Sequence, residues 1–185
     1  WLSRLPGGVA IATVLACGGF AAVSSSSVAT SATMAAVAMP EMRKFGYADK
    51  LAAGSVAAGG TLGILIPPSA LMILYGVLTE QSIGQLFLAG LLPGMVLCLL
   101  FAATVVIIAA LRPKIAPRGQ TYTMREKFAA LPGVIEMVLL ILLVLGGLWG
   151  GLFTPNEAGA MGAAGSLVIA LARRKLSRRD FLDSV

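Results

Sequence analysis

The feature that most constrains this chain is a run of 26 residues, Leu86–Leu111, without a charged side chain. A helix needs roughly 20 apolar residues to cross the hydrocarbon core of a bilayer, so this run predicts a membrane span. Val138–Phe153 predicts a second span and Ala158–Ala172 a shorter one, while Leu5–Val23 ends in a run of serines. Because a chain in lipid must satisfy its own backbone hydrogen bonds, the expected fold class is an all-α polytopic membrane protein.

The composition supports this fold class. Hydrophobic residues make up 58% of the chain, charged residues 12%, and the mean hydropathy is +0.92. Soluble domains carry about 25% charged residues. The net charge of +6 is split by the predicted spans and lacks interleaved aromatic residues, so nucleic acid is not an expected partner. Cys17 and Cys98 lie in apolar stretches and form neither a disulfide framework nor a metal motif.

The 14 Lys and Arg residues lie in five places along the chain. These are Arg4, Arg43–Lys50, Arg112–Lys127, Arg173–Lys175 and Arg178–Arg179. The loops Thr79–Gln85 and Thr154–Glu157 contain no basic residue. If successive spans alternate in direction, all 14 basic residues lie on one side of the membrane. The positive-inside rule makes that side cytoplasmic.

Two polar segments rich in Gly and Ser, Ser24–Thr30 and Gly59–Ser69, interrupt the apolar stretches. Irregular backbone persists at membrane depth only where protein or a water-filled cavity satisfies it. Helix packing alone explains scattered small residues. It does not explain Gly-Gly, Thr, Gly and Pro-Pro within one apolar segment. Paired interruptions are typical of the binding site of a secondary transporter, so together they predict a transport site.

The first interruption predicts a re-entrant helical hairpin over residues 5–40. The distribution of basic residues does not distinguish this hairpin from two complete spans, because both arrangements return the chain to the same side of the membrane. The first limb has about 17 apolar residues, whereas only Met34–Pro40 completes the return after the polar Ser24–Thr33 region. A tip near the membrane midplane fits these lengths.

The second interruption predicts a broken helix over residues 48–78. We expect Lys50–Ala58 to form its first half and Gly59–Gly60 to end that half, with positive φ angles or close backbone approach at Gly59, Gly60 and Gly63. Pro67-Pro68 prevents helix immediately before it, so the second half is expected over Ser69–Leu78. The N–H groups that begin this second half suit a carboxylate, and the carbonyls that end the first half suit a cation.

Both interruptions are rich in oxygen atoms that could bind a cation, and they contain no carboxylate, His or Cys. The hydroxyls offered to a cation include those of Ser24, Ser25, Ser26, Ser27, Thr30 and Thr61. Uncharged oxygen ligands fit sodium better than transition metals, which prefer imidazole or thiolate, so the expected coupling ion is sodium and no other cofactor is expected. An enzyme is not expected, because the chain has no His and Lys50 lies at a predicted membrane edge.

Several strings carry a family resemblance. They are Ser26–Thr30, Met39–Met42, Gly46-Tyr47, Gly60–Ser69 and Phe153–Ala158. The chain resembles, from about Arg4 to Leu182, the large membrane subunit of tripartite ATP-independent periplasmic (TRAP) transporters. The string Gly-Thr-Leu-Gly-Ile-Leu-Ile-Pro-Pro-Ser at Gly60–Ser69 is the most specific. Family members commonly have glycine where Ser25 stands. The resemblance implies a fragment that covers roughly the first half of the subunit.

The resemblance implies half of an inverted-repeat, elevator-type ion transporter of the bacterial inner membrane. It implies sodium symport of small organic acids such as C4-dicarboxylates or sialic-acid-like carboxylates. The implied partners are a small membrane subunit, a periplasmic binding protein that delivers the substrate, and the lipid bilayer. Two alternatives stay open. One is a sodium/divalent-anion symporter that works without a binding protein, and the other is a purely structural membrane subunit.

By the same resemblance, the two interruptions form a sodium site and part of the substrate site. The expected sodium ligands are Ser24, Ser26, Ser27, Gly59, Thr61 and Gly63. The expected substrate contacts are Ser25, Thr30, Pro68 and Ser69.

The expected domain organisation has three parts. Residues 1–111 belong to the transport domain and include a span over 83–111. Residues 112–130 form a cytoplasmic interfacial arm or a plain linker, with Met124, Phe128 and Leu131 on its apolar face. Residues 131–185 form scaffold-like spans and a basic cytoplasmic tail. Glu136, one turn inside the first of these spans, is expected to snorkel or to make a polar contact near the cytoplasmic edge.

Overall fold

The computed structural model describes residues 2, 5–117, 124–129 and 131–172, and these residues form helices without any strand. The all-α expectation is therefore confirmed for the described residues. The elements, in order, are α1 (Gly8–Ser24), α2 (Ser27–Lys44), α3 (Asp49–Thr61), the 3-10 helix η2 (Leu62–Ile64), α4 (Ala70–Leu78), α5 (Ile83–Leu111), α6 (Met124–Ala129), α7 (Leu131–Trp149) and α8 (Pro155–Ala172). The basic residues beyond α8, which were expected to form a cytoplasmic tail, lie outside the described residues.

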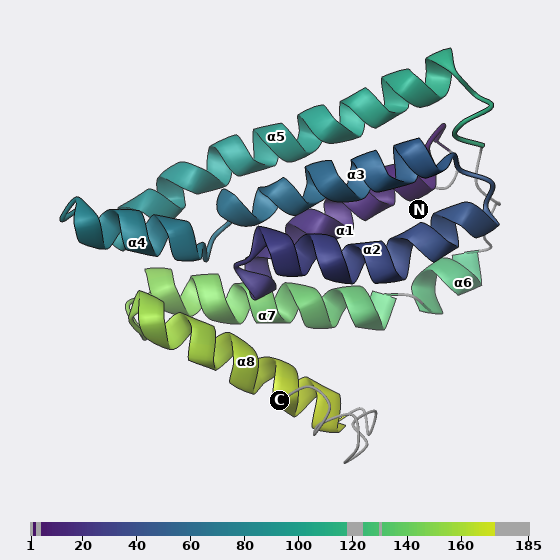
Figure 1. Cartoon of the computed structure of the whole chain (residues 1–185). Helices are drawn as coiled ribbons and strands as arrows, with labels where there is room; N and C mark the ends of the chain where they lie inside the picture. The colour runs from purple at the N-terminus through teal and green to yellow at the C-terminus, as the bar shows by residue number, and fades with distance from the viewer. Residues whose placement is uncertain (1, 3–4, 118–123, 130, 173–185) are drawn as a thin grey trace.

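The longest helix, α5, sets the length of the molecule. Its 29 residues extend about 43 Å at the 1.5 Å rise of an α-helix. In Figure 1 it runs along one side of the molecule, with α4 and α3 arranged one after the other beside it. Among the described helices, α5 is long and apolar enough to cross a bilayer by itself. The apolar helical segments Gly8–Ser24, Gly133–Trp149 and Ala160–Leu171 are shorter.

Helices α1 and α2 form a hairpin with a two-residue turn, Ser25-Ser26. The polar residues after this turn begin a regular helix, because Ser27–Thr33 are the first residues of α2. The return limb is therefore as long as the first, with 18 residues against 17. It also continues through Pro40 to Lys44, beyond the predicted end of the hairpin.

Gly46, rather than Pro40, sets the end of α2. Gly46 has a φ of 76°, and its N–H donates to the carbonyl of Arg43 at 2.9 Å. The N–H of Tyr47 donates to the carbonyl of Met42 at 3.0 Å. These two bonds form a Schellman motif, which needs a left-handed residue that glycine adopts without steric cost. Gly46-Tyr47, one of the strings that carry the family resemblance, therefore serves to end helix α2.

The broken helix is interrupted later than the sequence predicts. Helix α3 continues through Gly59 and Gly60 to Thr61 and then tightens into η2. The predicted end at Ala58 is wrong. Of the two alternatives predicted for these glycines, positive φ is also wrong, because the described glycines with positive φ are Gly7, Gly46 and Gly151. At Gly59 and Gly60 the absence of a side chain instead permits close packing by α1 and α2. Close approach, rather than a left-handed backbone, explains these glycines.

The non-helical part of the interruption is Leu65–Ser69, which contains a cis peptide bond between Pro67 and Pro68. Ser69 occupies the N-cap position of α4 with an extended backbone. The second half-helix then ends at Leu78, which confirms the prediction for this half. The chain therefore contains two helical segments joined by five irregular residues.

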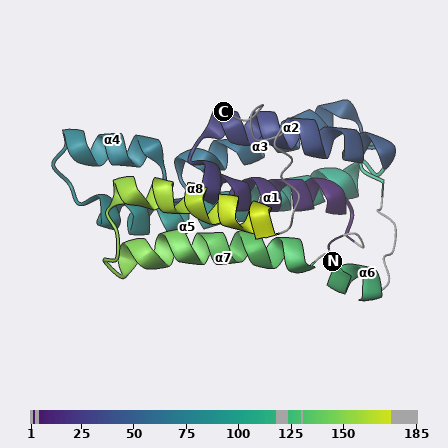
Figure 2. The same ribbon diagram turned by 90° about the horizontal axis from the view of Figure 1, so that it is seen from below.

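One buried core holds α1, α2, α3, η2 and α5 together. Its largest fully buried side chains include Met42 and Leu62, and it extends past α5 to Ala116. Helices α7 and α8 lie side by side in Figures 1 and 2 and pack through small residues, since Gly162 faces Val144 and Gly165 faces Leu140. Short α6 precedes α7, and its Met124 and Phe128 side chains are exposed.

Candidate cation and substrate site

The hairpin tip is a tight turn in which two serines have different roles. Ser25 has a φ of 54°, and its N–H donates to the carbonyl of Ala21 at 3.0 Å, which ends α1. Ser26 has an extended backbone, and its Oγ accepts a hydrogen bond from the N–H of Ala29 at 3.2 Å. Ser26 is therefore the N-cap of α2, a position that serine favours.

A hydroxyl pair links the two limbs behind this turn. The oxygens Ser24 Oγ and Thr30 Oγ1 are 2.7 Å apart, and the Thr30 side chain is fully buried. Each hydroxyl thus satisfies the other inside the protein, as buried polar groups require. Ser24 and Thr30 hold the tip closed in this structure, so a ligand that contacts Thr30 must displace or share this bond.

The tip rests directly on the interrupted helix. A Cβ on Gly63 would lie 3.0 Å from the backbone nitrogen of Ser27 and 3.1 Å from the carbonyl carbon of Ser26. A Cβ on Gly60 would overlap the hydroxyl of Ser31. Glycine at both positions therefore allows backbone-to-backbone approach that a side chain would prevent. The structure brings the two sequence interruptions together at this contact.

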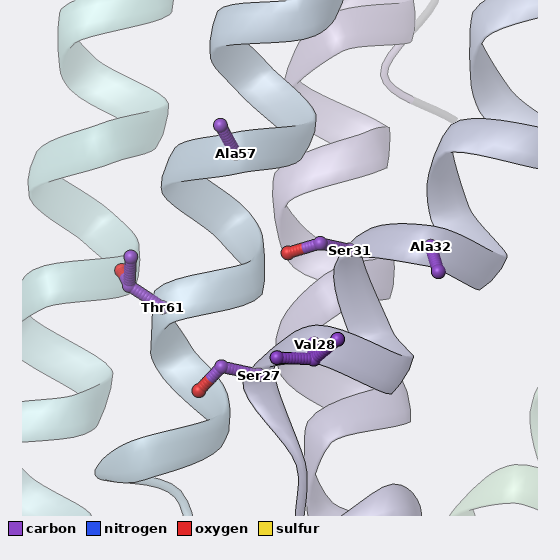
Figure 3. Close-up of a pocket in the computed structure, with 6 residues that line it drawn as sticks. All are labelled: Ser27, Val28, Ser31, Ala32, Ala57 and Thr61. Atoms are coloured by element: carbon purple, nitrogen blue, oxygen red, sulfur yellow. The ribbon is translucent and has the colours of Figure 1, made fainter.

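An open cavity of about 480 Å³ lies beside the contact. Its lining residues are Ser27, Val28, Ser31, Ala32, Ala57 and Thr61. Figure 3 shows the hydroxyls of Ser27, Ser31 and Thr61 around this space, on α2 and at the end of α3. Thr61 Oγ1 donates to the carbonyl of Ala58 at 2.6 Å, which leaves its oxygen free to accept from water or to bind a cation.

The predicted sodium ligands therefore lie in several different places. Ser27 and Thr61 line the cavity, while Ser24 and Ser26 lie at the turn, and Gly63 is covered by the turn. Gly59 faces another direction, because a Cβ there would lie 2.7 Å from the Cβ and Sγ of Cys17 on α1.

Ser31 is not among the predicted site residues, although it lines the same cavity. Its position four residues after Ser27 places both on one face of a helix, which is the signal that identifies it.

The predicted substrate contacts are divided between two places. Ser25 and Thr30 belong to the hairpin tip, whereas Pro68 and Ser69 lie at the start of α4. Pro68 is buried, and Ser69 is 1% exposed with no hydrogen-bond partner for its hydroxyl. In the described part of the chain, no hydrogen bond joins Pro68 or Ser69 to the tip.

The sequence comparison decides the family. The family described as "Tripartite ATP-independent periplasmic transporter, DctM component" matches residues 2–184. The chain belongs to this family. The resemblance drawn from Gly60–Ser69 and the accompanying strings is thereby confirmed.

Similar proteins occur in several bacteria. The chain is 43% identical over 170 residues to the C4-dicarboxylate TRAP transporter large permease protein DctM of Pseudomonas aeruginosa, covering 92% of this chain and 39% of that protein. It is 39% identical to the 2,3-diketo-L-gulonate TRAP transporter large permease protein YiaN of Escherichia coli, covering 89% and 38%. It is 37% identical to the isethionate TRAP transporter permease protein DctMQ of Oleidesulfovibrio alaskensis, covering 100% and 29%. The chain therefore spans well under half the length of these three TRAP permeases.

The Phe153–Ala158 string of this TRAP family chain has a structural role away from the cavity. The N–H and Oγ1 of Thr154 donate to Oε2 of Glu157 at 2.7 and 2.9 Å, and the N–H of Glu157 donates to Thr154 Oγ1 at 3.4 Å. This is a capping box, and Pro155 occupies the first helical position, which proline favours. The bonds from Thr154 hold the pKa of the Glu157 carboxyl below its usual range. The string begins α8.

Proposed function

We propose that this chain forms part of the transmembrane subunit of a sodium-coupled symporter that imports small organic acids. The observation that carries the proposal is the seating of the hairpin tip on the interrupted helix, next to a cavity lined by Ser27, Ser31 and Thr61. A purely structural subunit requires helix packing but gives no reason for two irregular segments to meet beside a hydroxyl-lined opening.

The position of the interruption along α5 supports a site inside the membrane. A Cβ on Gly94 of α5 would lie 3.1 Å from a side-chain atom of Ile66, so the interruption lies beside Gly94. From Gly94, α5 extends about 16 Å toward Ile83 and about 25 Å toward Leu111. If α5 crosses the bilayer, both the interruption and the hairpin tip lie within its span. The hairpin is then re-entrant, as in an elevator-type transporter built from inverted repeats.

The chemistry of the two segments supports a cation and a carboxylate as co-transported species. Hydroxyls of Ser27 and Thr61 supply uncharged oxygen ligands, which suit sodium. The first N–H groups of α4 lack partners within their own helix and carry the positive end of its dipole, which suits a carboxylate. The unpartnered hydroxyl of Ser69 lies at this same helix start. The remaining half of the transporter supplies the other contacts.

The relatives supply the proposed substrates and partners. The Pseudomonas aeruginosa and Escherichia coli relatives are named for C4-dicarboxylates and 2,3-diketo-L-gulonate. We therefore propose small carboxylates, of the C4-dicarboxylate or sialic-acid-like type, as substrates. The name DctMQ of the Oleidesulfovibrio alaskensis relative supports a small membrane subunit as partner. A periplasmic binding protein would deliver the substrate, and the bacterial inner membrane would hold the complex with its basic loops in the cytoplasm.

Uptake by the full-length protein tests the proposal. The transporter is reconstituted into vesicles with its small subunit, and uptake of radiolabelled carboxylate is measured with inward sodium or potassium gradients. We expect uptake to need both sodium and the binding protein. Uptake that proceeds equally with potassium would refute sodium coupling. Sodium-driven uptake without any binding protein would favour the sodium/divalent-anion symporter.

A further inference from the structure

The buried core indicates where the moving body of this transporter ends along the chain. Every residue of the core cluster lies between Ala10 and Ala116, on α1, α2, α3, η2 and α5, at Tyr47 in the α2–α3 connection, or at Ala116 after α5. Helices α7 and α8 contribute none of its members in the described part of the chain. Among the described residues of these two helices, the buried hydrophobic ones are Val144, Leu145 and Ala158. The core thus extends past the end of α5 but does not reach α7.

Tyr47 closes the base of the hairpin. The Tyr47 side chain is buried, and its hydroxyl accepts a hydrogen bond from the N–H of Val9 at 3.2 Å. Val9 lies in the first turn of α1, whose N-cap residue Gly7 supplies no side-chain cap. The bond therefore satisfies one of the N–H groups that a helix start leaves unpaired. Burial raises the pKa of the Tyr47 hydroxyl.

The residues just after α5 fold back onto the same base. The carbonyl of Ile115 accepts a hydrogen bond from the N–H of Ala48 at 3.0 Å, and Ala48 is the N-cap of α3. Ala116 is 2% exposed and belongs to the core cluster. A Cβ on Gly46 would lie 3.6 Å from Cγ of Pro117, in ordinary van der Waals contact. We call Tyr47, Ala48, Ile115, Ala116 and Pro117 the basal clasp.

The contact between α1 and α7 has a different character. A Cβ on Gly19 would meet only the flexible end of the Met137 side chain, at 2.6 Å from Cε. Two open cavities of about 600 and 430 Å³ lie along this contact. The first is lined in part by Leu15 and Val134 and extends to α2, and the second is lined in part by Phe20 and Met137 and extends to α8. Protein cores are close-packed, and shear motions are small slides of one packed helix past another, so the loosely filled contact between α1 and α7 is a place where two bodies can slide.

We propose that the basal clasp makes residues 112–117 part of the moving body, which extends from α1 through Pro117 and slides against α7. The inference rests on the proposed elevator mechanism. It adds the position at which the moving body ends, which lies after Pro117 instead of at the end of α5. It also assigns Tyr47 and Ile115 as positioning residues that couple the hairpin base to the connecting segment.

Thiol bridging in the full-length transporter tests this boundary. Three double-cysteine variants are made with Cys17 and Cys98 replaced by Ala. A48C/I115C bridges the basal clasp, G19C/M137C bridges α1 to α7, and V144C/G162C bridges α7 to α8 as a control within the scaffold. Each is reconstituted with its small subunit and binding protein and treated with the shortest bifunctional methanethiosulfonate. Sodium-driven uptake is measured before treatment, after treatment and after reduction.

We expect the bridged A48C/I115C and V144C/G162C variants to retain uptake within about twofold of their reduced forms, because each bridge lies inside one rigid body. The bridged G19C/M137C variant should lose uptake at least about tenfold and recover on reduction. Loss of uptake on bridging A48C/I115C, with recovery on reduction, would overturn the proposed boundary. Full uptake by the bridged G19C/M137C variant would instead refute the elevator motion itself, whatever the result at the clasp.

Discussion

Replacing Gly63 by Ala tests the seat of the hairpin tip. An alanine Cβ at this position would lie 3.0 Å from the nitrogen and 3.2 Å from the Cα of Ser27, and 3.1 Å from the carbonyl carbon of Ser26. All three are backbone atoms, so the contact is relieved only if the tip itself moves. Overpacking of this kind costs about 1–3 kcal/mol.

We expect this displacement to weaken sodium binding, because the tip and the interrupted helix together form the proposed site. A coupling of about 1–3 kcal/mol corresponds to about a 5- to 150-fold rise in the sodium concentration that gives half-maximal uptake. The assay measures sodium-dependent uptake by the full-length Gly63→Ala protein. Thermal unfolding in sodium and in potassium, measured in parallel, separates lost sodium binding from lost folding, because a ligand stabilises only the state that binds it.

Gly54→Ala is the matched control. Gly54 lies on α3, the helix that leads into the 3-10 helix η2 that contains Gly63, but a Cβ at Gly54 meets no atom within 4 Å. This variant should keep its sodium dependence and gain up to about 1 kcal/mol from the higher helix propensity of alanine. Gly59→Ala should lower thermal stability without a selective effect on sodium, because its Cβ meets Cys17. Equal sodium dependence of Gly63→Ala and Gly54→Ala would refute the reasoning.

Three further predictions concern the tip, the start of α8 and the topology. Ser25→Gly should raise the melting temperature and Ser25→Val should lower it, because a left-handed residue other than glycine costs about 1–2 kcal/mol; a lower melting temperature for Ser25→Gly would contradict this. Thr154→Val should raise the pKa of Glu157, measured by titration. Because the pKa of Glu157 is lowered in the folded state, the stability that this capping box contributes is present at neutral pH and is lost as pH falls through that pKa. The Thr154→Val protein should therefore lose less stability between neutral and acidic pH than the unmodified protein. In intact cells, a cysteine at Gln81 should react with an impermeant reagent and one at Lys114 should not; labelling at Lys114 from outside would reverse the topology.

The sequence predicts the helices well where apolar runs and turn residues agree. Uncharged Leu86–Leu111 lies within α5, and Pro67-Pro68 fixes the start of the second half-helix near Ser69. The end of α3 is not predictable from Gly59-Gly60, because a glycine pair permits a left-handed turn but also permits close packing. Cys17 of α1 and Ser31 of α2 occupy the space beside these glycines, and contacts with residues so far away in the chain have no local signal.

The candidate site is predictable as a meeting of two segments but not in its details. Serine hydroxyls predict oxygen ligands, and the structure places Ser27 and Thr61 on one cavity. The sequence does not show that Ser24 and Thr30 bond to each other, since that pairing depends on the two-residue turn between the limbs. It also does not show that Gly59 faces α1, because the orientation of a helix face depends on which neighbours bury it.

The most direct test of a sodium site at the hairpin tip compares two exposed threonines, each of which donates its hydroxyl to a backbone carbonyl one helical turn earlier. Thr61 Oγ1 donates to the carbonyl of Ala58 and lines the cavity, whereas exposed Thr104 Oγ1 donates to the carbonyl of Leu100 on α5. Sodium-dependent thermal stabilisation of the full-length transporter is measured for Thr61→Val and Thr104→Val. Loss of one oxygen that contacts a charge costs about 1.5–3 kcal/mol, so Thr61→Val should need about 10- to 150-fold more sodium. Thr104→Val should match the unmodified protein. An unchanged sodium requirement in Thr61→Val would contradict the proposed site.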